Sequence, residues 1–295
     1  MKSAPFRLVT PDSLEEALEV LDEHGDEAKV LAGGQSLVPI MNFRMAQPEV
    51  LVDLGRLADL RGIDLADDGT LRIGSTTRQR ALELHTTVAK NWHLVADAIP
   101  MIGHVGIRNR GTVGGSLAHA DPAAELPSVC VALDASLVAR GPQGRRVIPA
   151  SDFFQMIFTT DLAVNEVLTE VIIPPPSPGT GSAWLEFARR HGDFALIGVA
   201  AVVTLGEDGS CTDARLVLAG AENTPVRVDG GGVVKGRQPV PTLWDELATH
   251  AADSCEPPSD SHASARYRRR LVRVLGRRAL DLAARRATRG AMDDR

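Results

Sequence analysis

The stretch "RNRGTVGGSLAHADPAAELP", residues 108–127, crowds Gly111, Gly114 and Gly115 into five positions and then runs through an Asp-Pro pair into an apolar segment. A second glycine pair lies far upstream, in "LAGGQSLVP", residues 31–39. Glycine loses more conformational entropy on folding than any other residue. Two such segments therefore indicate that the backbone must come very close to something at both places.

Both glycine pairs follow a predicted strand or irregular segment and precede a predicted helix. Successive backbone N–H groups at such a junction form an anion-binding nest, which a helix N-terminus strengthens. Two nests from separate subdomains would hold both phosphates of one dinucleotide, whereas two plain turns are the alternative. Neither segment matches G-x-x-x-x-G-K-[ST], nor G-x-G-x-x-G after a strand, so a P-loop and a Rossmann fold are both excluded.

The composition is that of an ordinary globular protein. The 295 residues are 44% hydrophobic and 24% charged, with a formal net charge of −6 and 4% aromatic residues. An acidic chain with so few aromatic residues has neither the positive charge nor the stacking platforms of a nucleic-acid-binding protein. We therefore expect no nucleic-acid partner.

The cysteines and histidines form no recognisable metal motif. Cys130, Cys211 and Cys255 are widely spaced, which excludes a Cys-x-x-Cys zinc or iron–sulfur site and favours a reducing, cytoplasmic location. No His-x-x-x-His or G-x-S-x-G occurs, so we predict no metal ligand and no catalytic nucleophile. The N-terminus has no signal-peptide pattern, and no apolar run is long enough to predict a membrane span.

Periodicity and turn residues predict alternating helices and strands. Ser13 followed by Glu16, and then Gly25, predicts a capped helix over residues 13–25. Further helices are expected at 36–45, 77–84, 88–99, 240–253 and 263–287, and strands at 28–34, 49–54, 70–75, 136–140, 145–149, 167–173, 194–205 and 211–220. The segment "DGGGVVKG", residues 229–236, is expected to be a loop.

These elements suggest three domains. Residues 1–55 form a small α/β unit, residues 56–175 a second unit, and residues 176–290 a C-terminal domain that leaves 291–295 as a tail. The segment "IPPPSPGTGSA", residues 173–183, is the best linker candidate, because proline and glycine interrupt both helices and strands.

Four stretches together resemble one known family. They are "AGGQSLVPIMNFRMAQPEVLVDL" from residue 32, "IRNRGTVGGSLAHADPAAELP" from residue 107, "FARRHGDFALIGVAA" from residue 187 and "ARYRRRLVRVLGRRAL" from residue 265. In this order they are similar to the FAD-binding medium subunit of molybdenum hydroxylases, the xanthine dehydrogenase and carbon monoxide dehydrogenase family. The resemblance covers essentially the whole chain.

The resemblance implies an α+β fold, with a two-subdomain FAD-binding fold of the vanillyl-alcohol-oxidase type followed by a small C-terminal α+β domain of antiparallel strands and helices. It implies an oxidoreductase subunit that binds FAD non-covalently. Electrons would come from two [2Fe–2S] clusters in a small partner subunit, after a large molybdopterin subunit oxidises the substrate, and would leave to an external acceptor. The expected assembly is a dimer of heterotrimers.

The resemblance also implies two phosphate-binding segments. The first glycine segment, Ala32, Gly33, Gly34, Gln35, Ser36 and Leu37, would wrap the FAD pyrophosphate with backbone N–H groups. The second glycine segment, Thr112, Val113, Gly114, Gly115 and Ser116, would close on the phosphates and the ribityl chain. Many relatives carry His or Asn where this chain has Gln35 or Gly34.

Other residues inherit roles from the same resemblance. Glu125 would accept hydrogen bonds from the adenosine ribose, with Asp121 as a weaker candidate, and Ile102 and Leu168 would place apolar groups around the isoalloxazine. Some relatives carry a lysine near the flavin where this chain reads Leu185–Glu186. Phe194 either shields the flavin ring or belongs to the core.

Two alternatives to an electron-transfer subunit remain open from the sequence. One is a free-standing FAD-dependent oxidase or reductase of the same fold, and the other is a nucleotide-binding module without redox activity. The basic C-terminal helix is equally open, because residues 266–289 hold ten arginines and one acid. These arginines are either solvated, paired with carboxylates of this chain, or in contact with an acidic partner.

Overall fold

The computed structural model describes residues 2–293, and the side chains of residues 2–288. The chain forms two compact units that interleave along the sequence. The first unit comprises the residues up to Leu82 together with Val105–Ala120 and Ala135–Pro174, and the second comprises Glu83–His104, Asp121–Asp134 and the residues from Pro175 onward. The predicted domain boundaries at residues 55, 175 and 290 stay predictions.

A small parallel sheet opens the first unit. Its strands run in the order β1 (Arg7–Val9), β3 (Val50–Asp53), β2 (Ala28–Leu31), and helix α1 (Leu14–His24) connects β1 to β2. The Ser13 hydroxyl accepts the N–H of Glu16 at 3.1 Å, which confirms the predicted cap, although the Glu16 carboxylate reaches back to the N–H of Asp12. The side chains of Ala17, Leu18 and Leu21 are buried in a core with β2 and β3.

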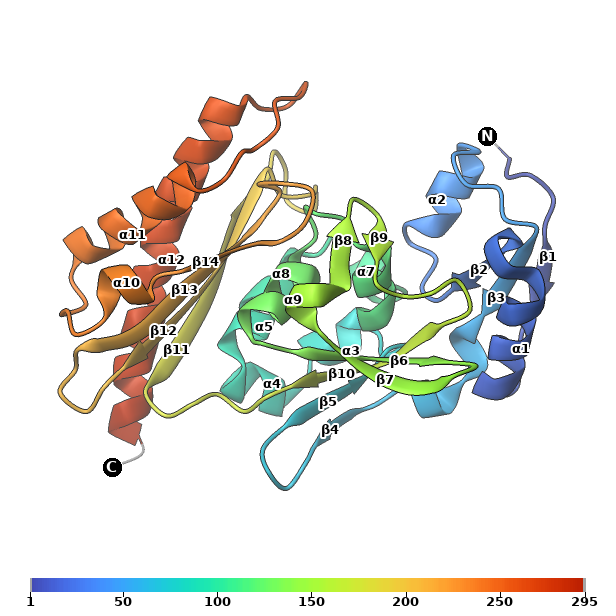
Figure 1. Cartoon of the computed structure of the whole chain (residues 1–295), viewed down its shortest axis with the longest axis horizontal. Helices are drawn as coiled ribbons and strands as arrows, with labels where there is room; N and C mark the ends of the chain where they lie inside the picture. The colour runs from blue at the N-terminus through green and yellow to red at the C-terminus, as the bar shows by residue number, and fades with distance from the viewer. Residues whose placement is uncertain (1, 294–295) are drawn as a thin grey trace. The chain divides into compact units, whose positions relative to one another are not determined.

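A five-stranded antiparallel sheet forms the rest of the first unit (Figure 1). Its order is β4 (Ile63–Leu65), β5 (Leu71–Gly74), β10 (Val167–Ile173), β6 (Ser136–Gly141) and β7 (Gly144–Pro149). The pairing of β10 with β6 shifts register between Leu168 and Glu170, which is a β-bulge. Bulges re-aim side chains and are common beside binding sites.

The second unit is built on a four-stranded antiparallel sheet, ordered β11 (Thr180–Phe187), β12 (Ile197–Leu205), β13 (Cys211–Ala219), β14 (Val226–Asp229). Helix α12 (Ala265–Asp293) lies along this sheet with α11 (Pro241–Asp253) beside it (Figure 1). Alternate residues of β12 and β13 face these helices, and their apolar side chains make the core of this unit. The two predicted C-terminal helices and the adjacent pair of strands are confirmed.

Shorter elements complete both units. The helices are α2 (Leu37–Asn42), α3 (Gln79–Glu83), α4 (Thr86–Asn91), α5 (His93–Ala98), α6 (Val105–Arg108), α7 (Val113–His119), α8 (Glu125–Ala132), α9 (Ala150–Phe153) and α10 (Gly231–Val234), and the strands are β8 (Phe154–Met156) and β9 (Thr159–Thr160). Single 3₁₀ turns lie at Gly25–Glu27, Leu54–Arg56, Ala58–Leu60 and Ile99–Met101.

The structure corrects several local predictions. The predicted loop over 229–236 contains the short helix α10, because the Val234 side chain is fully buried and draws the turn inward. The single helix predicted over 88–99 is two helices, because Trp92 leaves the helical conformation at φ −118°, ψ 71°. The predicted linker over 173–183 is shorter, since β11 begins at Thr180. Of the predicted tail, residues 291–293 continue α12, and residues 294 and 295 lie outside the described residues.

Candidate functional site

The two glycine segments meet inside the first unit. A Cβ atom added to Gly33 would lie 2.4 Å from the carbonyl oxygen of Arg110 and 2.7 Å from the Cα of Gly111. A Cβ atom on Gly115 would lie 2.6 Å from the hydroxyl oxygen of Thr112 and 3.4 Å from the Cβ of Ala32. Glycine is therefore required at position 33 because backbone packs directly on backbone there, before any ligand is considered.

The first glycine segment presents open backbone N–H groups. It follows β2 and turns at Gly34, whose φ of 70° is a left-handed conformation that glycine adopts without strain. The Gln35 amide donates to the carbonyl of Gly33 at 3.0 Å and holds the turn. In the described part of the chain, the N–H groups of Gly34, Gln35 and Ser36 donate to no protein acceptor. Such a run of free donors suits a phosphate.

The second glycine segment is not a loop but the beginning of helix α7. Thr112 is the N-cap, and its hydroxyl accepts the N–H of Gly115 at 3.0 Å. The other N–H groups also have protein acceptors: that of Val113 donates to Thr77, that of Gly114 to Ser75, and that of Ser116 to Thr112. The prediction of an open nest here is wrong, because these donors anchor α7 to the end of β5. What this segment leaves for a ligand is hydroxyl groups.

Two buried polar side chains lie beneath the glycine segments. Ser75 and Gln79 are each 4% exposed, and neither the Ser75 Oγ nor the Gln79 Oε1 has a hydrogen-bond partner among the described residues. The Gln79 Oε1 lies 2.6 Å from where a Cβ on Gly111 would be. Buried polar atoms without partners are costly, and donors of a group bound at the glycine segments would satisfy them. We call the two glycine segments together with Ser75, Arg78 and Gln79 the cradle, whose free N–H groups suit the phosphates of a dinucleotide.

Positive charge gathers where the two segments meet. Arg78 donates a hydrogen bond to the carbonyl oxygen of Arg110, the same oxygen that faces Gly33. Burial lowers the pKa of the Arg78 guanidinium, and the neighbouring charges of Arg61 and Arg110 lower it further, while Asp53 opposes them. A concentration of arginines beside open N–H groups suits an anion.

Glu125 is the most perturbed carboxyl group of the second unit. It is the first residue of α8 and only 4% exposed. Burial, together with the nearby charges of Glu186 and Asp121, raises its pKa to about 8. Burial also raises the pKa of Glu186, although the Trp184 indole donates to its carboxylate at 2.9 Å and His191 lies nearby. Strongly perturbed pKa values cluster at functional sites, which makes Glu125 a candidate site residue.

The remaining predicted site residues are distributed over both units. Asp121 opens the expected turn, since its carboxylate accepts the N–H of Ala123 at 2.9 Å. Ile102 is buried in the second unit, and Leu168 is buried at the bulge of β10 in the first. Phe194 is 58% exposed, so the core interpretation of this residue is wrong.

The residues that support the cradle were not identified from the sequence. Ser75, Arg78 and Gln79 lie in the polar run that follows β5 and begins α3. The Trp184–Glu186 pair on β11, in the second unit, was not identified either. The only available signal was a run of polar residues directly after a predicted strand. Nothing in the sequence of that run distinguishes residues of a binding site from those of an ordinary surface turn.

Fold and cradle define a nucleotide-binding protein with an attached α+β domain, and the comparisons specify its family. Residues 4–176 match the FAD binding domain in molybdopterin dehydrogenase, and residues 182–283 match the CO dehydrogenase flavoprotein C-terminal domain. The chain therefore belongs to the FAD-binding medium subunits of molybdenum hydroxylases. The predicted family and α+β fold class are confirmed.

Individual relatives are similar over nearly their full length. The chain is 42% identical to the 6-hydroxypseudooxynicotine dehydrogenase complex subunit alpha of Paenarthrobacter nicotinovorans, over 99% of this chain and 100% of that protein. It is 36% identical to the carbon monoxide dehydrogenase medium chain of Hydrogenophaga pseudoflava, over 94% and 96%. A solved carbon monoxide dehydrogenase from that organism superposes with a TM-score of 0.93 at 35% identity, over 97% and 99% of the two chains.

The structure bears on two other expectations. Within residues 2–293, no helix is both long enough and apolar enough to cross a membrane. All three cysteines are buried free thiols, and burial raises the pKa of Cys130 to about 12. These thiols are therefore poor nucleophiles and belong to the packing of the protein.

Proposed function

We propose that this chain is the electron-transfer flavoprotein of a three-subunit molybdenum hydroxylase. It takes electrons from the [2Fe–2S] clusters of an iron–sulfur subunit and passes them to an external acceptor. The observation that carries the proposal is the contact of the two glycine segments, which leaves a row of free N–H groups beside arginines in a family of FAD-binding subunits. We expect the assembly to be a cytoplasmic dimer of heterotrimers.

The residues of this chain supply binding rather than acid–base chemistry. The first glycine segment would hold the pyrophosphate, the hydroxyls of Thr112 and Ser116 would add donors, and Glu125 would accept from the ribose. Ile102 and Leu168 would contact the isoalloxazine. When bound, FAD supplies the two-electron chemistry, and the protein sets its position and access. We assign no catalytic residue to this chain.

Substrate choice would lie in the molybdopterin subunit. Relatives that are 36–42% identical to this chain are named for chemically unrelated substrates, namely 6-hydroxypseudooxynicotine, caffeine and carbon monoxide. Similar medium subunits thus serve different reactions, which supports a shared electron-transfer role. The alternative of a free-standing oxidase is not favoured, because these relatives are themselves parts of complexes.

A stepwise assay tests the proposal. The purified chain is expected to be yellow, and acid precipitation is expected to release all of the flavin as FAD into the supernatant. With its iron–sulfur and molybdopterin partners, an oxidisable substrate is expected to reduce the flavin, whereas the isolated chain should not respond. Turnover by the isolated chain at an ordinary enzymatic rate, about 1–10³ per second, would establish the free-standing oxidase instead.

A further inference from the structure

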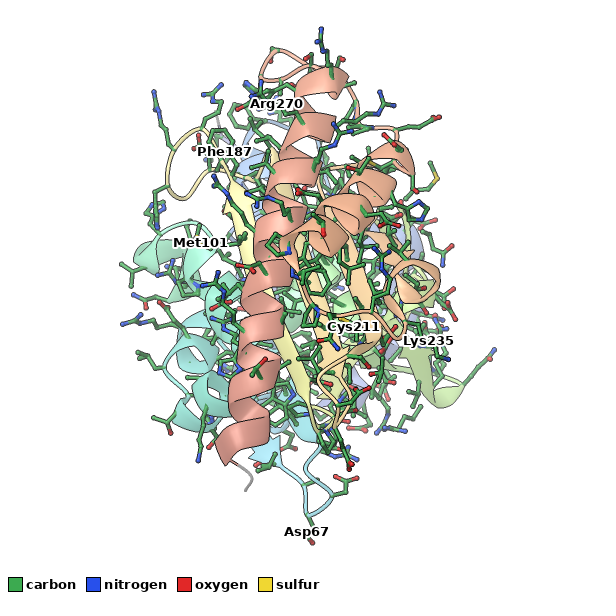
Figure 2. The ribbon with its side chains drawn as sticks, turned by 90° about the vertical axis from the view of Figure 1, so that its left-hand side faces the viewer. Asp67, Met101, Phe187, Cys211, Lys235 and Arg270 are labelled. Atoms are coloured by element: carbon green, nitrogen blue, oxygen red, sulfur yellow. The ribbon has the colours of Figure 1, made fainter. Side chains whose placement is uncertain are left out.

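One exposed surface of the second unit combines aromatic side chains with arginines. It comprises residues of the end of β11, of the loop after it and of the first turns of α12: Phe187, Arg190, Arg266, Tyr267 and Arg270. The rings of Phe187 and Tyr267 meet edge to face with centroids 6.4 Å apart, and Arg268 donates to the carbonyl of Leu196. Figure 2 shows Phe187 and Arg270 toward the same end of α12. We call this set the aromatic–arginine surface.

Its two aromatic side chains are exposed although their rings contact each other: Phe187 is 42% exposed and Tyr267 is 39% exposed. Clustered exposed apolar side chains mark interaction sites on soluble proteins. Aromatic residues and arginine are also the types most enriched in interface cores and in hot spots. The composition of this surface therefore indicates a protein partner.

The charges of the surface are not balanced within the chain. Farther along α12, Arg277 pairs with Asp245 at 3.4 Å and Arg286 pairs with Asp97 at 2.6 Å. By contrast, Arg190, Arg266 and Arg270 form no ion pair with any described residue. The carboxylate of Asp260, which precedes α12, is already bound by the buried Arg268. Asp193, the one acid of the loop after β11, forms no ion pair with a described residue and offsets only one of the three arginine charges.

The positive charge of this surface indicates a partner with an acidic face. Because the whole chain has a net charge of −6, the excess positive charge is local to this surface. A second copy that docked through the same surface in a symmetric dimer would bring arginines against arginines, which disfavours that dimer. An acidic face on another subunit would complement the surface and would steer association electrostatically.

The position of the surface indicates which acidic partner it fits, because the surface lies near residues proposed to contact the flavin. Gly192, in the same loop, has a φ of 88°, and a Cβ there would lie 3.0 Å from the carbonyl oxygen of Gly103. The loop thus packs against the backbone directly after Ile102, which is proposed to contact the isoalloxazine. A protein docked on this surface lies beside the flavin-binding residues of the second unit. That is where a subunit that delivers single electrons has to be.

We propose that the aromatic–arginine surface docks an acidic face of the iron–sulfur subunit, an inference that rests on the proposed function. The test is equilibrium binding between the purified FAD-loaded chain and the purified iron–sulfur subunit of its complex, at low and high salt. Arg266→Glu and Arg270→Glu are each expected to weaken binding about tenfold or more, with most of the loss in association rate at low salt. Flavin content and unfolding temperature are measured alongside and are expected to be unchanged.

Arg278→Glu is the matched control. Arg278 is an exposed arginine on the same helix, forms no ion pair with any described residue, and lies two turns beyond Arg270 outside the surface. The Arg278→Glu variant is expected to bind the iron–sulfur subunit as tightly as the wild type. If the surface variants bind the iron–sulfur subunit like the wild type, the assignment is overturned. It is also overturned if these variants keep the iron–sulfur subunit but no longer bind the molybdopterin subunit or a second copy of the chain. If the wild-type chain holds no FAD or binds no iron–sulfur subunit, the proposed function itself fails, and the surface assignment fails with it.

Discussion

The carbonyl oxygen of Ser75 accepts the N–H of Gly114 at 2.8 Å, and a Cβ atom on Gly114 would lie 2.4 Å from the Cβ of Ser75. The first turn of α7 therefore rests directly on the end of β5, with no room for a side chain between them. This contact fixes the orientation of the helix whose N-cap belongs to the proposed cofactor cradle. The glycine serves protein packing and, through it, ligand binding.

Substitution of Gly114 is therefore expected to affect both folding and cofactor binding. Gly114→Ala overpacks a site bounded by backbone, which costs roughly 1–3 kcal/mol of unfolding free energy. The expected result is a lower denaturation midpoint for the FAD-free chain and weaker FAD binding. Gly106→Ala is the control, because a Cβ at Gly106 in α6 would meet nothing within 4 Å. Equal effects of the two substitutions would show that the Ser75 contact is unimportant.

Substitution of Gly34 is expected to act through the backbone conformation rather than through steric crowding. A Cβ there would meet only the side chains of Val38 at 3.2 Å and Leu31 at 3.4 Å, but the φ of 70° is left-handed. Gly34→Ala is expected to cost roughly 1–2 kcal/mol and to weaken FAD binding, because the free N–H groups are held by this turn. Gly34→Asn should recover part of the loss, since asparagine tolerates this conformation best after glycine. FAD titration of the two variants measures the difference, and equal affinities would argue against a role for the left-handed turn.

The strongest sequence predictions were those in which a local pattern and its physical cause coincide. Ser13, Glu16 and Gly25 mark the ends of α1 because caps act within a few residues, and the apolar runs of β12 and β13 are buried as expected. The two glycine pairs correctly indicated a close approach of backbone. They did not reveal that Gly33 approaches Arg110, because that contact joins segments far apart in the chain.

What the sequence could not show depends on tertiary contacts. The N–H groups of the second glycine segment are occupied only because β5 lies beneath them. β1 and β14 were missed because each is three or four residues long and is defined by its neighbour in the sheet. Likewise, Glu125 was identified by resemblance, whereas its burial depends on how α8 packs within the second unit.

The Asp97–Arg286 pair is expected to stabilise the second unit. Arg286 donates to both carboxylate oxygens of Asp97, at 2.6 and 3.0 Å, and to the carbonyl oxygen of Ser182 at 2.7 Å. Both side chains are only about a quarter exposed, at 23% and 25%, so water would replace few of the hydrogen bonds that are lost when the pair is broken. Arg286→Met is expected to lower the unfolding free energy by roughly 1–3 kcal/mol. Arg285→Met, which removes an exposed i, i+4 pair with Asp281, is expected to cost at most about 0.5 kcal/mol.

Glu125 is expected to discriminate FAD from FMN. Hydroxyl donors of the adenosine ribose would favour the ionised carboxylate of Glu125 over the neutral acid that burial favours in the FAD-free chain. Glu125→Ala then removes a hydrogen bond to a charged group, worth roughly 1.5–3 kcal/mol. FAD affinity should then fall about ten- to a hundredfold. FMN has no adenosine, so its affinity should be unaffected. Equal losses for FMN and FAD, measured by flavin fluorescence, would make Glu125 a structural residue.

Glu125 is also expected to make the stability of the FAD-free chain depend on pH. Burial raises its pKa from 4.5 to about 8, so folding favours the neutral acid. The stability that Glu125 contributes is fully present below pH 4.5 and is lost as the pH rises through about 8, and the loss across this window is on the order of a few kcal/mol. Glu125→Gln, which stays neutral, is expected to gain stability relative to the wild type between pH 5 and pH 9 in denaturant titrations. As a control, Glu207→Gln removes an exposed carboxylate from the same unit and should show no such gain. Parallel pH profiles for the wild type and Glu125→Gln would mean that Glu125 ionises normally in the folded protein.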